Sequence, residues 1–137
     1  MKPARLASRD DDSGSAAVLG LALIGFVLLL AAALGAVGAL LRARVEVLAA
    51  ADAAALAAAP VTFRPFGAAG TPAQEAARFA VDNGTRLVRC VCPVDPSWGP
   101  REVEVEVEKQ VRLWPAGLIA VRATSRAEFT PGALLDD

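Results

Sequence analysis

Histidine and tyrosine are absent from the 137 residues, and cysteine occurs only twice, as Cys90 and Cys92. Without histidine, the chain lacks the side chain that most often shuttles protons near neutral pH and binds metals. Two cysteines are too few for a disulfide scaffold or a four-ligand zinc site. The sequence also lacks a phosphate-loop motif and a nucleophile placed beside a base. We therefore expect no enzyme, no cofactor and no metal site.

Charge of one sign is not in excess either. The 14 Lys and Arg residues are balanced by 15 Asp and Glu residues, which gives a net charge of −1. Bulk electrostatics therefore provide no drive towards nucleic acid, and no nucleic-acid partner is expected. Hydrophobic residues, in contrast, make up 55% of the chain, more than in an ordinary soluble domain. This excess is concentrated in one stretch.

Residues Ser15 to Leu41 contain no charged side chain. As a helix, these roughly 27 residues span about 40 Å, which is enough to cross a hydrocarbon core of about 30 Å. We therefore predict membrane insertion, with lipid as a partner. Lys and Arg occur on both sides of the stretch, so charge bias orients it weakly. A short leader and a longer C-terminal part favour a cytoplasmic N-terminus and an extracytoplasmic C-terminal domain.

The predicted helix continues beyond the membrane as a stem. Residues Arg42 to Ala59 favour helix throughout, and Pro60 ends the pattern. Asp52 is an isolated acid on this stem, and it either faces water or pairs with a neighbour. Within the apolar part, small residues recur at four-residue spacing, which allows close helix packing in lipid or arises by chance in an Ala-rich helix. These residues are Ala31, Gly35 and Ala39.

A second, short helix is predicted after a turn-rich connector at 60–70. Thr71 is the expected N-cap, Pro72 the first helical residue, and Gln74 the partner in a capping box. The helix runs to about Asp82, and Asn83-Gly84 ends it. The residues expected on one side of it are Ala73, Ala77, Ala80 and Val81.

Three strands follow, which makes the expected fold class α+β. The first is Arg86 to Cys92, with Val88, Cys90 and Cys92 on one face. The second, Glu102 to Leu113, alternates valines with glutamates, and only Lys109 interrupts its apolar row. The third follows a turn at 114–117. Its apolar face carries Ile119, Val121, Ala123, Ala127 and Phe129, with Ser125 as a small packing residue.

The second and third strands are most simply a hairpin. Both apolar rows fall on odd numbers, so paired residues must sum to an even number to keep both rows on one face. A sum of 230 pairs Glu108 with Arg122 and Glu104 with Arg126, whereas a sum of 232 pairs Glu106 with Arg126. Each exposed pair contributes about 0.2–1 kcal/mol.

The row of glutamates could form a metal or acid–base site, and the two cysteines could form a disulfide. Successive carboxylates on one strand face lie about 7 Å apart without a further ligand, so a solvated face is favoured over a metal or acid–base site. Cys90 and Cys92 are also two apart on one strand, near 7 Å between Cα atoms, beyond comfortable disulfide range. We expect no stable bond between them; buried free thiols, an intermolecular bond and a strained internal bridge stay as alternatives.

Several segments resemble the TadE-like pseudopilins of the Flp/Tad pilus system. Residues 13–18 (SGSAAV) are similar to the start of these proteins, and 50–59 (AADAAALAAA) to their Ala-Asp-Ala-rich run. Residues 83–90 (NGTRLVRC), followed by the Val-Glu alternation, resemble the small TadE-like proteins of high-GC actinobacteria. The resemblance implies a class III signal peptide at 1–14, a transmembrane and stem helix at 15–59, a linker at 60–70, and a small pilin-like domain at 71–137 with a disordered C-terminal tail.

The resemblance also implies a function in pilus assembly or a related secretion apparatus, as a minor pilin or pseudopilin. A prepilin peptidase would cut between Gly14 and Ser15, and other Tad subunits would be partners. The family expects glutamate at mature position five, where it neutralises a neighbour's N-terminal amine, but this chain has Leu19. That argues against a self-polymerising major pilin.

Two other interpretations remain open. The chain could be a generic single-pass protein that displays a binding domain, with its leader intact. It could also be a secreted domain, because Ala31 and Ala33 offer a signal-peptidase site before Leu34. The mature N-terminus distinguishes all three.

Overall fold

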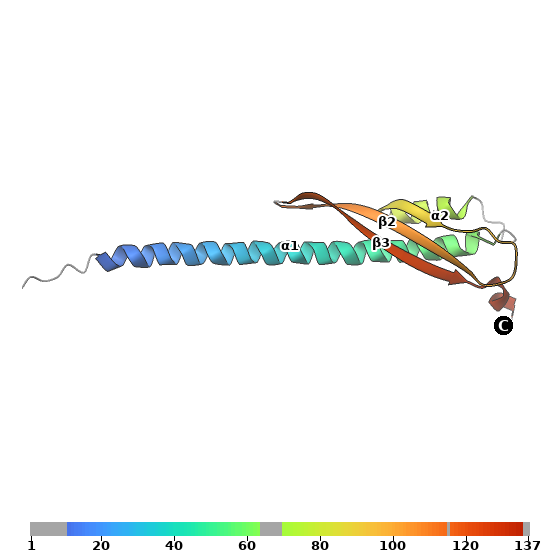
Figure 1. Cartoon of the computed structure of the whole chain (residues 1–137), viewed down its shortest axis with the longest axis horizontal. Coiled ribbons are helices and arrows are strands. Elements are labelled where there is room, and N and C mark those ends of the chain that lie inside the picture. Colours follow the sequence, from blue (N-terminus) through green and yellow to red (C-terminus); the bar gives the residue numbers. More distant parts are fainter. Residues whose placement is uncertain (1–10, 64–69, 115, 136–137) are drawn as a thin grey trace, which may run out of the picture. The chain divides into compact units, whose positions relative to one another are not determined.

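The computed structural model describes residues 11–63, 70–114 and 116–135 and confirms an α+β fold (Figure 1). A long helix α1 (Asp11–Val61) and a short helix α2 (Pro72–Asp82) precede one three-stranded antiparallel sheet. The chain divides into two compact units, one up to Gly38 and one from Ala39 onwards. The strands and final 3-10 turn are β1 (Arg86–Val91), β2 (Arg101–Leu113), β3 (Gly117–Phe129) and η2 (Pro131–Leu135).

Helix α1 begins four residues before the predicted Ser15 and ends two residues after the predicted Ala59. Pro60 lies in its last turn, where it removes one helical hydrogen bond because it has no N–H. The end is closed by Thr62, whose backbone N–H donates to the Ala59 carbonyl at 3.2 Å and whose hydroxyl donates to the same oxygen at 2.6 Å. The helix is thus one continuous element shared by both units.

From Ala43 onwards, one side of α1 is buried against the sheet. The buried positions recur every three or four residues, as a helix with one packed face requires. All but one are alanines, so this face of the helix is formed by small side chains. The buried residues of this stripe are Ala43, Val47, Ala50, Ala51, Ala54, Ala55, Ala58 and Ala59. They form one core cluster with Val103, Val105 and Val107.

The sheet has the order β1-β2-β3, with antiparallel pairing throughout. In the β2–β3 hairpin, Val103 pairs with Ala127 and Glu108 with Arg122, so paired residues sum to 230. This confirms the first of the two predicted registers and excludes the second. Val103, Val105 and Val107 of β2 are buried, Val111 is half-buried, and the glutamates face the other way, as predicted.

Helix α2 begins as predicted. The Thr71 hydroxyl accepts a hydrogen bond from the Gln74 N–H, and the Gln74 side chain accepts one from the Thr71 N–H. The predicted buried side is right only for Ala80. The core takes Pro72, Ala76 and Ala80, at four-residue spacing, whereas Ala73 is exposed and Val81 is 67% exposed. The four alanines of α2 lie within about 100° of one another around the helix, and the core extends from them towards Phe79 rather than towards Val81.

Strand β1 also differs from its predicted alternation. An irregularity between Leu87 and Arg89 shifts the register against β2. Leu87 and Cys90 therefore pack on the core, whereas Val88, which was expected beside Cys90, is exposed. A β-bulge inserts one extra residue and reverses the alternation on one side of it. The predicted connector at 60–70 lies largely outside the described residues, as do the last two residues of the predicted tail.

Candidate functional site: anchor, stem and charged sheet face

The first part of α1 is a candidate membrane span. Its most apolar window has a mean hydropathy of 2.8, and none of that window is buried within the protein. Large apolar side chains such as Leu21, Phe26 and Leu34 are more than half exposed. Exposed apolar surface on this scale is unfavourable in water and favourable in hydrocarbon. The segment is thus a candidate membrane anchor, with its backbone hydrogen bonds satisfied inside the helix.

The residues implied by the resemblance lie on this helix. Gly14 and Ser15 are in its first turns, and both are exposed. Leu19 follows one turn later and is 69% exposed. The small residues Ala31, Gly35 and Ala39 lie farther along, all exposed. Their role in helix packing stays a prediction.

Two polar contacts fix the stem against the sheet. Lys109, which interrupts the apolar row of β2, places its Nζ 2.8 Å from the Glu46 carboxylate of α1. Nearer the end of α1, the Ser125 hydroxyl of β3 donates to the Asp52 carboxylate. Ser125 is therefore more than a packing residue, and Asp52 both faces water and pairs with a neighbour. Both contacts join residues more than 60 positions apart and so fix how the stem and sheet align.

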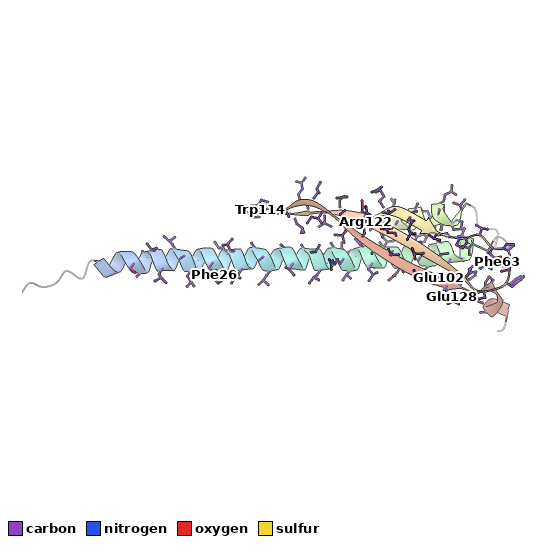
Figure 2. All side chains as sticks on the ribbon, in the orientation of Figure 1. Phe26, Phe63, Glu102, Trp114, Arg122 and Glu128 are labelled. Atoms are coloured by element: carbon purple, nitrogen blue, oxygen red, sulfur yellow. A yellow bond between two sulfur atoms is a disulfide. The ribbon has the colours of Figure 1, made fainter. Side chains whose placement is uncertain are left out.

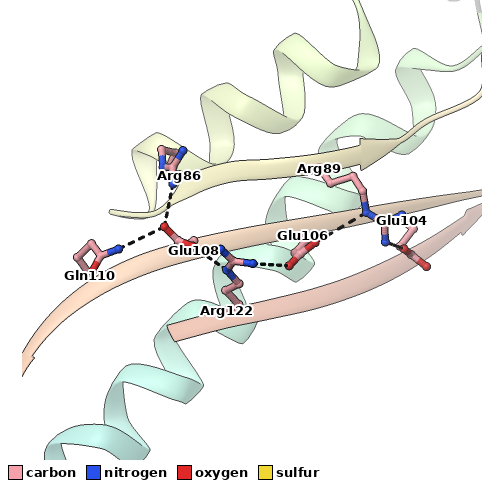
Figure 3. Close-up of polar contacts among 7 residues, drawn as sticks. All are labelled: Arg86, Arg89, Glu104, Glu106, Glu108, Gln110 and Arg122. Atoms are coloured by element: carbon pink, nitrogen blue, oxygen red, sulfur yellow. Dashed lines mark hydrogen bonds and ion pairs between the residues drawn. The ribbon is translucent and has the colours of Figure 1, made fainter. Parts of the chain in front are cut away.

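The glutamates of β2 are interleaved with arginines from both flanking strands (Figure 3). Glu108 lies between Arg86 of β1 and Arg122 of β3, at N–O distances of 2.8 and 2.7 Å. Glu104 similarly lies between Arg89 and Arg126, and its distance to Arg126 is 2.8 Å. The structure thus contains both cross-strand pairs expected from the register. It adds the β1 arginines, which sequence reasoning missed because the β1–β2 register was not predicted.

Glu108 is the most enclosed acid of this face, with 5% of the residue exposed. Hydrogen bonds from Arg86 and then Arg122 lower the pKa of its carboxyl below the ordinary value. The carboxylate is therefore charged and neutralised by its neighbours at neutral pH. Among the described residues no group of three His, Cys, Asp or Glu side chains is arranged to hold a metal ion. The arrangement is a charged, internally paired sheet surface.

The expectation for the cysteines is wrong. Cys90 and Cys92 are joined by a disulfide, with their Cα atoms 5.5 Å apart. The predicted separation near 7 Å assumed an extended strand through Cys92, but β1 ends at Val91. The chain therefore bends before the second cysteine and brings the two Cα atoms within the usual disulfide range.

Arg101, at the start of β2, is a structural residue that sequence reasoning missed. It is only 6% exposed, and its guanidinium donates to the carbonyl oxygens of Asp95, Ser97 and Gly99 in the preceding loop. The guanidinium carbon also lies 5.1 Å from the ring centroid of Phe63, which in turn packs edge-on against Trp98 at 4.8 Å. Arg101 therefore ties the 93–100 loop to the end of α1. A lone arginine beside a proline carries no signal of this role in the sequence.

Comparison with protein families gives one match, and it covers the anchor and the stem. Residues 14–62 match the family model described as "Putative Flp pilus-assembly TadE/G-like". No curated protein and no solved structure matched the chain. The match begins at the predicted cleavage site and ends one residue after α1. It confirms the TadE-like resemblance over residues 14–62 and supports involvement in Flp pilus assembly.

Proposed function

We propose that this protein is a TadE-like minor pilin or pseudopilin, a structural component of Flp/Tad pilus assembly or of a related secretion apparatus. The observation that carries the proposal is the continuity of α1. One helix begins as an exposed apolar anchor and ends as a stem buried in the C-terminal fold. The TadE/G-like match at 14–62 covers both parts.

An accessory role fits better than that of a filament-building subunit. Leu19 stands at the position where a glutamate would neutralise the N-terminal amine of a neighbour. An unpaired ammonium in hydrocarbon is costly, so tight packing of identical subunits in lipid is disfavoured. A subunit that stays in the membrane, or joins other Tad subunits at a pilus tip, avoids this cost.

The proposed topology places the N-terminus in the cytoplasm and the C-terminal domain outside the membrane. The Cys90–Cys92 disulfide supports this orientation, because disulfides persist mainly in oxidising compartments outside the cytosol. The acids of the sheet face support a structural rather than a catalytic role. Each of Glu104, Glu106 and Glu108 is paired with arginine, so none is held free as a general base.

The processing of the N-terminus tests the proposal. The mature protein is purified from cells with and without the prepilin peptidase, and its N-terminal residues are sequenced. We expect Ser15 as the first residue in the first strain and an intact leader in the second. An intact leader in both strains supports a plain membrane anchor, and a start near Leu34 supports a secreted domain; either result contradicts the pilin-like route.

A matched pair of variants controls for misfolding. Gly14→Leu changes the residue before the cleaved bond, whereas Gly20→Leu makes the same substitution six residues later. At both positions, an added Cβ meets no atom within 4 Å, so neither change disturbs packing within the protein. We expect Gly14→Leu to retain its leader and Gly20→Leu to be processed. Equal processing of both would contradict cleavage at Gly14.

A further inference from the structure

The tip of the β2–β3 hairpin is a second apolar surface of the protein, separate from the anchor. Trp114 is 85% exposed there and Leu118 is 64% exposed. Figure 2 shows Trp114 at the end of the hairpin. Strand β1 pairs with β2 only as far as Glu108, so the hairpin from Lys109 onwards is two strands wide. A tryptophan with this exposure contributes nothing to the core of its own domain.

The contacts of the hairpin with α1 show in which direction the tip points. Ser125 contacts Asp52, and Lys109 contacts Glu46. Farther along, Ile119 to Ala123 face Leu40, Arg44 and Leu48 across an open groove of about 460 Å³. Towards its tip, the hairpin thus runs alongside progressively earlier residues of α1. It points to the N-terminal end of the C-terminal unit, where the charge-free segment ends.

The length of the hairpin brings its tip level with the first residues of the C-terminal unit. Trp114 lies five residues beyond Lys109, or about 17 Å in an extended strand. The same distance corresponds to about 11 residues of helix. Counting back from Glu46, about half of those helical residues already leads to Leu41, the last residue of the charge-free stretch. A hairpin tip at that height is therefore level with Leu41.

We propose that the hairpin tip is a second membrane contact, with Trp114 and Leu118 seated in the interfacial layer of the same bilayer that holds α1. Tryptophan is enriched at this layer because its ring is apolar and its indole N–H stays hydrated. Arg112, two residues before Trp114, and Arg44, which follows the charge-free stretch, suit the anionic headgroups found at the same depth, whereas Arg42 is paired with Glu46. A tip and an anchor on one membrane would fix the tilt of the domain.

The fluorescence of the two tryptophans tests this proposal in the full chain. In Trp98→Phe, Trp114 is the sole tryptophan; in Trp114→Phe, Trp98 is the sole one. Trp98 packs against Phe63, which lies just beyond the far end of α1, and serves as the matched control. Both variants are placed in vesicles made with lipids brominated near the headgroup end of the acyl chain. We expect Trp114 emission to be blue-shifted and quenched several-fold more strongly by bromine than Trp98 emission.

Aqueous iodide gives the opposite test, quenching Trp98 and sparing Trp114. The proposal is overturned if iodide quenches Trp114 as well as it quenches Trp98, or if neither quencher reaches Trp114, which would indicate a protein partner or a second copy. If Trp98→Phe does not fold, subtracting the Trp114→Phe spectrum from that of the unaltered protein gives the same comparison. Carbonate extraction of the membranes tests the anchor separately from the hairpin tip. If the protein stays in the membrane after extraction while iodide quenches Trp114, the anchor holds and only the contact of the tip is overturned.

Discussion

The stem is packed through alanine, and this makes a sharp prediction for one substitution. Ala54 is fully buried in the cluster formed by α1 and the valines of β2, whereas Ala49, on the same helix, is exposed. Ala54→Leu inserts three extra carbon atoms where the helix and sheet are in contact. Overpacking of this kind costs typically about 1–3 kcal/mol of unfolding free energy. Ala49→Leu adds the same atoms on the solvent side, and leucine is nearly as good a helix former as alanine.

Thermal unfolding in detergent micelles measures the difference, followed through near-ultraviolet circular dichroism, which reports tertiary packing. For a domain of about 100 residues, each kcal/mol lowers Tm by roughly 4–8 °C. We therefore expect Ala54→Leu to lower Tm by at least 4 °C and Ala49→Leu to leave it nearly unchanged. The packing account is refuted if both variants have the same Tm as the unaltered protein, or if Ala49→Leu lowers Tm as much as Ala54→Leu does.

Three further outcomes follow from the contacts of the C-terminal unit. The denatured, unreduced protein should resist thiol alkylation, because Cys90 and Cys92 are bonded; two labelled thiols before reduction would contradict this. The folded-state pKa of Glu108 is lowered, so its carboxylate contributes stability above the ordinary pKa of 4.5, and this contribution is lost as pH falls. Replacement of Glu108 by Gln should remove that contribution. The unaltered protein should thus lose its advantage over Glu108→Gln in acid, and a constant difference across pH would refute the pairing. Arg101→Lys should cost about 1–3 kcal/mol and expose the 93–100 loop to protease, because lysine cannot donate to several carbonyls in a fork; unchanged cleavage would count against the role of Arg101.

The sequence was most informative where one physical constraint acted alone. The charge-free stretch predicts a long apolar helix, because it is long enough to cross the hydrocarbon core and a segment that does so must present apolar side chains to lipid. The hairpin register followed from two apolar rows on odd numbers, since a slip of one residue would expose one row. The start of α2 followed from Thr71 and Gln74, whose reciprocal hydrogen bonds depend only on local spacing.

Features that depend on contacts between distant segments were not predictable from spacing. The β-bulge after Leu87 arises from pairing with β2, and it moved Val88 out of the core. The disulfide depends on where β1 ends, which the strand pattern placed one residue too late. Arg101 is bonded to loop carbonyls that the fold brings together, and carbonyl oxygens carry no residue-specific signal.

The central claim is that α1 anchors a folded domain outside the membrane. Labelling of single introduced cysteines in intact cells, with a membrane-impermeant maleimide, tests it most directly. Glu128→Cys lies on an exposed position of β3, and Val27→Cys lies within the apolar helix. The native cysteines stay silent without reductant, because they are bonded to each other. We predict labelling of Glu128→Cys in intact cells and none of Val27→Cys; labelling of Glu128→Cys only after lysis, or equal labelling of both, would contradict the claim.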